Sequence, residues 1–214
     1  MTLSAYYDAV VMEALKKALR DAEAGRLAPY RFAQIKATIE VFIETMEYVD
    51  DNEPTRISDG PESQPPSAAP TVLCVAARSK LDEAAAALLG QLLATQGLRA
   101  VVVTAADLAP GGAAGVDLTA IRIVCLSAFD VAEGRAQVKF LVRRLRRTMP
   151  SARFVGGFWR ADLKDHADAD LIGIATDDVV TTLVGAVERC SVHQQEMVTV
   201  ADPAAVAMAH DLRP

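Results

Sequence analysis

Two Ser-x-x-Asp segments stand at points where polar side chains could do chemistry. Ser79 precedes Asp82 by three residues, and Ser127 precedes Asp130 by the same spacing. Each segment follows a short apolar run and opens an amphipathic one, so each marks the change from a strand to a helix. A serine and a carboxylate at this spacing favour a helix N-cap. The alternative is an anion site, in which two helix N-termini and the basic residues around Ser79 hold a negatively charged ligand.

A pair of glycines and the only tryptophan of the chain form a second candidate. Gly156 and Gly157 follow the predicted strand Arg153–Val155, and Trp159 stands next to Arg160. Adjacent glycines allow another group to approach the backbone closely, which suits either a ligand or a tight turn. We expect Trp159 on a loop at the rim of the site. Its ring would either pack against the neighbouring helix or stack on a ligand.

Carboxylates at predicted strand ends allow a third interpretation. Thr176, Asp177 and Asp178 follow the apolar run Leu171–Ala175. Together with Asp130, the two aspartates could hold a magnesium ion for the hydrolysis of a phosphoryl group. Helix capping explains the same residues more simply.

The basic cluster Arg143–Arg147, with the sequence RRLRR, ends a predicted helix that also carries Lys139. Cations are favourable at a helix C-terminus, and we expect Phe140 and Leu145 to face the sheet while the arginines face solvent. A phosphate or nucleic-acid site is the alternative. The net charge of −6 and the lack of interleaved aromatic residues argue against nucleic acid.

Other catalytic and metal-binding patterns are missing from the sequence. There is no Gly-x-Ser-x-Gly, no P-loop and no Gly-x-Gly-x-x-Gly segment. The three cysteines, Cys74, Cys125 and Cys190, are widely spaced and predict buried thiols in a reducing compartment. No histidine has a second ligand at a recognised spacing. We therefore predict a protein that is not an enzyme and has no metal site.

The elements that must position these residues fall into four segments of different composition. Residues 1–52 contain two amphipathic runs separated by Gly25 and Pro29, which predicts a helical hairpin. Residues 53–70 are rich in proline, serine and acids, which is typical of a flexible linker. Residues 71–195 alternate between strand-like and helix-like runs, and residues 196–214 form a C-terminal tail. We expect the hairpin to dock on the α/β domain or on a second copy.

The alternation in residues 71–195 predicts a doubly wound parallel sheet. The predicted strands are apolar on both faces, as in a sheet covered by helices on both sides: Thr71–Ala76, Ala100–Thr104, Ile121–Leu126, Arg153–Val155 and Leu171–Ala175. The predicted helices are Leu81–Gln96, Val131–Met149 and Asp177–Cys190, whereas the Gly-rich segment Ala105–Ala120 predicts an irregular crossover. Five strands with right-handed crossovers suit the flavodoxin-like Rossmann order 2-1-3-4-5. Ligands of this fold bind at the carboxyl ends of the first and third strands.

The composition and the apolar runs of the chain exclude several classes of protein. With 51% hydrophobic residues among 214, the chain can bury a core and is not disordered. No apolar run reaches about 18 residues, and the first residues lack the features of a signal peptide. We therefore expect a cytoplasmic protein.

The α/β region resembles the cobalamin-binding domain family. The resemblance rests on the five-strand pattern, on Ser127 after the third strand (VCLSAF), and on Gly156-Gly157 after the fourth (RFVGG). It implies a cobalamin carrier or sensor. The family's histidine-containing loop corresponds to Ala77–Asp82, which has no histidine, so cobalamin would be held without that ligand.

Nearly the whole chain is also similar to the soluble region of bacterial predicted permeases of the autoinducer exporter family. The similar segments are YYDAVVMEALKKALRDAEAGRLAP, LDEAAAALLGQLL, VCLS and LVRRLRR, together with the Pro-rich linker. This resemblance implies a cytosolic domain associated with a membrane transporter and no known catalytic residues.

Taken together, these patterns predict a non-enzymatic ligand-binding or regulatory domain. A degenerate cobalamin carrier and a magnesium-dependent hydrolase remain the alternatives. Expected partners are a small-molecule ligand, a membrane transporter and a second copy through the N-terminal helices, but no nucleic acid. The predicted binding residues are Arg78, Ser79, Lys80, Ser127, Asp130, Gly156, Gly157, Trp159 and Thr176.

Overall fold

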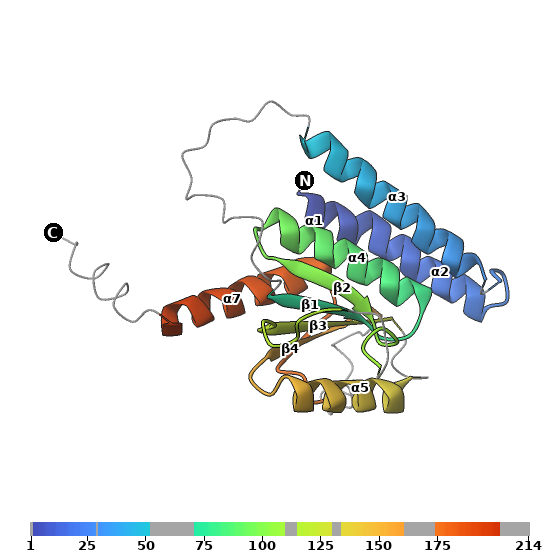
Figure 1. Ribbon diagram of the computed structural model, residues 1–214. Coiled ribbons are helices and arrows are strands. Elements are labelled where there is room, and N and C mark those ends of the chain that lie inside the picture. The colour runs from blue at the N-terminus through green and yellow to red at the C-terminus, as the bar shows by residue number, and fades with distance from the viewer. Residues whose placement is uncertain are drawn as a thin grey trace.

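Five parallel strands form one sheet in the computed structural model (Figure 1), which describes residues 2–28, 30–51, 71–109, 115–129, 134–160 and 174–201. The strand order is β2-β1-β3-β4-β5. The strands are β1 (Val72–Ala76), β2 (Ala100–Thr104), β3 (Ile123–Ala128), β4 (Arg153–Phe158) and β5 (Asp178–Val180). All four pairings are parallel, which confirms the predicted doubly wound fold. The predicted linker 53–70, Pro29, Asp130 and the residues after Ala201 lie outside the described residues.

Helices cover both faces of the sheet (Figure 1). On one face lie α4 (Lys80–Thr95) and α7 (Leu183–Ala201), and on the other lies α5 (Arg135–Thr148). Every residue of β1 and β3 is buried. This double covering explains why the central strands are continuous apolar runs rather than alternating ones.

The fifth strand was predicted at the wrong place. Ile174 and Ala175, the described part of the predicted strand Leu171–Ala175, have no strand pairing, and β5 is the three-residue segment Asp178–Val180. This edge strand has three residues and pairs only with β4. Because it is so short, it gives only a weak hydrophobic pattern in the sequence. The last helix correspondingly begins at Leu183, after Thr182, whose hydroxyl accepts a hydrogen bond from the Gly185 N–H at 3.1 Å. It continues to Ala201, past the predicted end of the domain.

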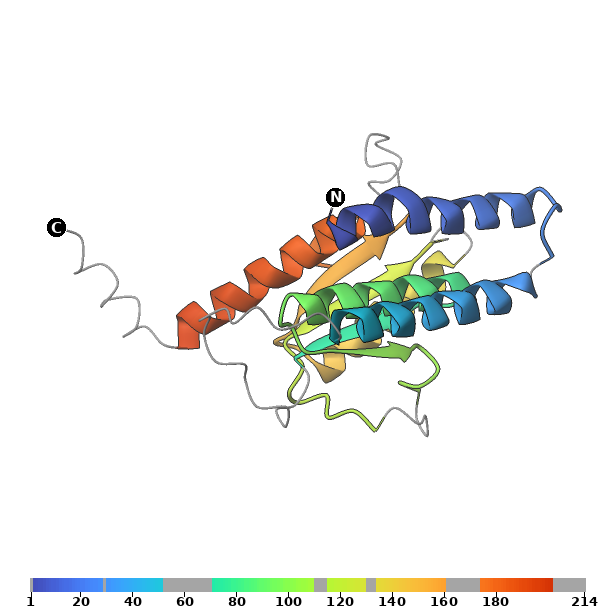
Figure 2. The ribbon, with the colours of Figure 1, turned by 90° about the horizontal axis from the view of Figure 1, so that it is seen from above.

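The N-terminal residues form the predicted helical hairpin. Its first arm consists of α1 (Leu3–Tyr6), a π-helical turn η1 (Tyr7–Met12) and α2 (Glu13–Glu23), and its second arm is α3 (Arg31–Asp51). Gly25 adopts a φ of 70° at the end of α2, the left-handed conformation that was expected there. The helix α3 lies alongside α4 (Figure 2).

The hairpin shares a core with the α/β region. Tyr7, Met12 and Leu15 are at most 2% exposed and belong to the same buried cluster as the apolar residues of α4 and α7. Polar contacts fix the position of the hairpin. The Tyr7 hydroxyl donates to Gln91 Oε1, and the Asp8 carboxylate accepts from the N–H groups of Leu183 and Val184 at 2.7 and 2.9 Å. Asp8 thereby satisfies two of the unpaired N–H groups at the start of α7.

The crossover between β2 and β3 is irregular, as its glycines predicted. In its described part, residues 105–109 and 115–122, there are turns but no helix. None of the described helices is long and apolar enough to span a membrane.

Candidate functional site

Asp82 lies at the carboxyl ends of β1 and β3, where the sequence predicted a ligand crevice. Its side chain is buried in the first turn of α4. The carboxylate accepts hydrogen bonds from the N–H groups of Arg78 at 3.0 Å, Ser79 at 2.8 Å and Phe129 at 2.8 Å. Burial raises the pKa of Asp82, whereas these N–H groups act in the opposite direction. The carboxylate therefore joins the loop after β1 to the end of β3.

Ser79 is the N-cap of α4. Its hydroxyl accepts a hydrogen bond from the Asp82 N–H at 3.1 Å, and the Asp82 carboxylate accepts one from the Ser79 N–H, which completes a capping box. Lys80 pairs with Glu83 on the surface of the same helix. Both residues thus have a structural role within α4.

Trp159 is buried beside the same strand ends. Of the two alternatives for its ring, packing in the core rather than stacking on a ligand is therefore the one that the structure shows. Trp159 is 1% exposed, and its indole Nε1–H donates to Ser127 Oγ at 2.7 Å. The Ser127 hydroxyl in turn donates to the main-chain oxygen of Asp82 at 3.1 Å. Ser127 is itself the fifth residue of β3 rather than the first residue after a strand.

The glycine pair makes room for aromatic rings of the chain itself. A Cβ at position 157 would lie 2.3 Å from the Trp159 ring, and one at position 156 would lie 2.8 Å from the Phe158 ring. On the α4 face, the space between the carboxyl ends of β1 and β3 is therefore filled by Trp159 and Asp82.

Thr176, Asp177 and Asp178 lie at the amino end of β5, so their prediction at a carboxyl end is wrong. The cause is the misplaced strand. Asp177 accepts from the Phe154 N–H at 2.7 Å and from Arg146 at 2.9 Å. Burial raises the pKa of Asp177, but the contacts with Phe154 and Arg146 outweigh it and the pKa is lowered.

The neighbouring aspartate, Asp178, contacts His193: its Oδ2 lies 2.6 Å from His193 Nε2. Asp177 and Asp178 lie at the amino end of β5, whereas Asp130 follows the carboxyl end of β3 in the sequence. Within the described ranges, no group of three His, Cys, Asp or Glu side chains is placed to hold a metal ion.

The three cysteines are buried, as predicted, and their sulfur atoms gather in the core. Cys125 Sγ lies 3.1 Å from Cys190 Sγ, and Cys74 is the register partner of Cys125 on the neighbouring strand. The hydrogen bond with Cys125 and burial raise the pKa of Cys190 far above its usual value. Thiols in this state are poor nucleophiles.

An open groove lies on the other face of the sheet, at the carboxyl ends of β1 and β2. Its volume is about 480 Å³, which lies within the range of small-molecule sites. Its floor and walls come from the ends of two strands and from α5 between Ala136 and Arg144. It is lined by Ala77, Arg78, Ala105, Ala136, Gln137, Phe140, Leu141 and Arg144.

Two arginines from different elements line this groove. Arg78 Nη1 lies 3.4 Å from Gln137 Oε1, and Arg144 Nη2 lies 3.4 Å from the main-chain oxygen of Ala105. Neither guanidinium forms an ion pair with any residue that the structure describes. The amino end of α5, which has no acidic residue in its first turn, adds a partial positive charge. The groove is therefore cationic with largely apolar walls.

Of the predicted binding residues that the structure describes, only Arg78 lines this groove. Gln137 and Phe140 were not predicted to bind a ligand, and Arg144 was named only within the cluster Arg143–Arg147, for which a phosphate site was the alternative. Phe140 was expected against the sheet, yet this side chain is 62% exposed. Helical spacing could have corrected the error, because the buried residues Val138, Leu141, Val142 and Leu145 define a face from which Phe140 points away.

Comparisons of the chain with protein-family models, with curated proteins and with solved structures find no match.

Proposed function

We propose that this chain is a non-catalytic binding domain whose groove holds a small anion that carries an apolar group. The observation that supports this function is the pair Arg78 and Arg144, which line one groove without a carboxylate partner in the described part of the chain. Guanidinium groups bind carboxylates and phosphates through paired N–H donors. Apolar walls suit the remainder of such a ligand.

The position of the groove also supports a binding role. Ligands of doubly wound folds bind outside the carboxyl ends of the strands, and this groove is at that edge. It lies where the crossover after β2 passes without a helix in its described part. The similarity to the soluble region of predicted permeases supports the further proposal that a membrane transporter is the partner that responds to ligand binding.

The two alternative functions gain no support from the site geometry. Ser127 and Gly157, which carried the resemblance to cobalamin-binding domains, are in contact with Trp159. Their side of the crevice therefore offers a corrinoid no free surface in this conformation. The described carboxylates of the magnesium hypothesis, Asp177 and Asp178, are bound to Arg146 and His193.

Isothermal titration calorimetry tests the proposal. The panel contains inorganic phosphate, nucleoside monophosphates, aromatic and aliphatic carboxylates, and cobalamin. We expect saturable binding of at least one anion, weakened about tenfold or more in Arg78→Gln and in Arg144→Gln, because each loses a charge-assisted hydrogen bond.

Arg147→Gln is the matched control, since it removes a cation from α5 outside the groove. It should bind as the parent does. Absence of binding by every anion, or binding that survives in the Arg78→Gln/Arg144→Gln double variant, would rule out this function for the groove.

A further inference from the structure

The helix α5 differs in charge from the rest of the molecule. It contains six basic residues and no acidic one, with the sequence RAQVKFLVRRLRRT. The whole chain has a net charge of −6, so the remainder carries −12. A helix with this composition on an acidic protein creates a strongly polarised surface.

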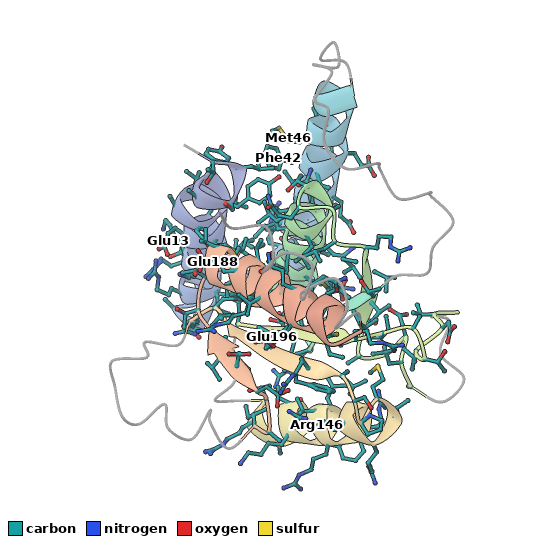
Figure 3. The ribbon with its side chains drawn as sticks, turned by 90° about the vertical axis from the view of Figure 1, so that its left-hand side faces the viewer. Glu13, Phe42, Met46, Arg146, Glu188 and Glu196 are labelled. Carbon is teal, nitrogen blue, oxygen red and sulfur yellow. The ribbon has the colours of Figure 1, made fainter. Side chains whose placement is uncertain are left out.

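The apolar stripe of α5 fixes which of its residues point outward. Val138, Leu141, Val142 and Leu145 are buried against the sheet. On the opposite side of the helix Ala136, Phe140, Arg143 and Arg147 are exposed, and Lys139 beside them is half-buried. Figure 3 shows nitrogen-tipped side chains that project from α5 away from the sheet. We name as the α5 face these four exposed residues together with Lys139 at their flank.

The cations of the α5 face are available to a partner. Arg146, at the side of the helix, pairs with Asp177 at 2.9 Å. Lys139, Arg143 and Arg147 form no ion pair with the described residues. Capping of the helix C-terminus accounts for cations in the last turn only, so Lys139 and Arg143 need another explanation.

Phe140 lies in the middle of these cations and is 62% exposed. Exposing so large an apolar side chain gains nothing for the isolated molecule, because burial of a phenylalanine is worth about 2 kcal/mol. An aromatic ring surrounded by basic side chains matches the boundary of an anionic bilayer, where phosphates lie at the surface and acyl chains lie just below it.

We propose that the α5 face docks on an anionic lipid membrane, with its cations at the phosphates and Phe140 inserted among the lipids. Charge complementarity carries the proposal. A polynucleotide would use the same cations, but nucleic-acid surfaces of this kind offer several aromatic rings for stacking, whereas the α5 face offers one. The proposal is independent of the groove: Ala136 and Phe140 border both surfaces, but Arg143 and Arg147 lie only on the α5 face.

Co-sedimentation of the full chain with lipid vesicles tests this proposal. One set of vesicles is phosphatidylcholine alone, and the other is phosphatidylcholine and phosphatidylglycerol in a ratio of about two to one. We expect binding to the anionic vesicles only, weakened by added salt because surface charges are screened. Arg143→Gln/Arg147→Gln should bind about fivefold more weakly for each arginine removed.

Two further variants separate the roles of charge and insertion. Phe140→Ala should lower the part of the binding that persists at high salt. Lys16→Gln/Lys17→Gln removes two cations from α2, and Arg78→Gln removes one from the groove, so neither should change vesicle binding. Circular dichroism verifies that each variant is folded.

Three results would overturn the proposal. The first is equal binding to neutral and anionic vesicles, and the second is unchanged binding by Arg143→Gln/Arg147→Gln. The third is binding of single-stranded RNA or DNA through the same arginines without vesicle binding, which would assign the α5 face to a polynucleotide.

Discussion

At the scale of single residues, the position of Gly157 shows why this chain needs a glycine there. The Trp159 ring and the Leu126 main-chain oxygen lie 2.3 and 3.0 Å from where a Cβ would stand. Trp159 cannot move without losing its hydrogen bond to Ser127. We predict that Gly157→Ala lowers the free energy of unfolding by about 3 kcal/mol, because overpacking a rigid site forces side chains off their rotamers. Urea denaturation measures the change.

Gly90→Ala is the control for this prediction. Its Cβ would lie 2.6 Å from Val102 Cγ2, the end of a side chain that is 41% exposed and can rotate away. The gain in helix propensity of about 1 kcal/mol offsets the remaining strain. Equal destabilisation by the two substitutions would show that the Trp159 site relaxes as easily as the contact between α4 and β2.

The residues of the predicted site show what a sequence can indicate at this scale. Ser-x-x-Asp predicted the capping box of Ser79 correctly, because an N-cap is a local structure. The contacts that fill the crevice are not local: Ser127 and Trp159 lie 32 positions apart, and Asp82 and Phe129 lie 47 apart. No pattern in the sequence pairs such residues, so a serine and a tryptophan of the core were predicted to bind a ligand.

At the scale of elements, the strands with long apolar runs and the helices with clear amphipathic periodicity were predicted well. The central strands β1 and β3 are continuous apolar runs because both of their faces are covered. The short edge strand β5 has no such signal, and its misplacement moved Thr176, Asp177 and Asp178 to the wrong end of the sheet. The groove escaped prediction because it forms where three elements meet, beside a crossover whose described part has no helix.

Asp177 joins three of these elements, since it precedes β5 and its side chain bonds to β4 and α5. We predict that Asp177→Asn lowers the free energy of unfolding by about 1 kcal/mol at neutral pH, because an exposed charge-assisted contact is lost. The pKa of Asp177 is lowered in the folded state, so the stabilisation is complete above the ordinary value of 3.8 and is lost as the pH falls through the folded value.

Urea denaturation of both proteins at neutral and acidic pH tests the role of Asp177. The difference between parent and variant should shrink below pH 3.8. Glu188→Gln, which changes an exposed residue of α7 without a described ion pair (Figure 3), should match the parent at every pH. A difference that stays constant down to strongly acidic pH contradicts a role for the Asp177 charge.

At the scale of the whole molecule, the N-terminal helices share a core with the sheet, which is one of the two docking alternatives that the sequence left open for the hairpin. Met12 is 1% exposed within the cluster that includes Trp159. Trp159 is the only tryptophan, so its fluorescence reports unfolding of the sheet region. We predict that Met12→Ala leaves a cavity in the shared core and lowers the free energy of unfolding, measured by tryptophan fluorescence, by about 2–4 kcal/mol. Val10→Ala, at a position 47% exposed, should leave the transition in place. If the hairpin folded independently, Met12→Ala would change helix content by circular dichroism at low denaturant and leave the tryptophan transition unmoved.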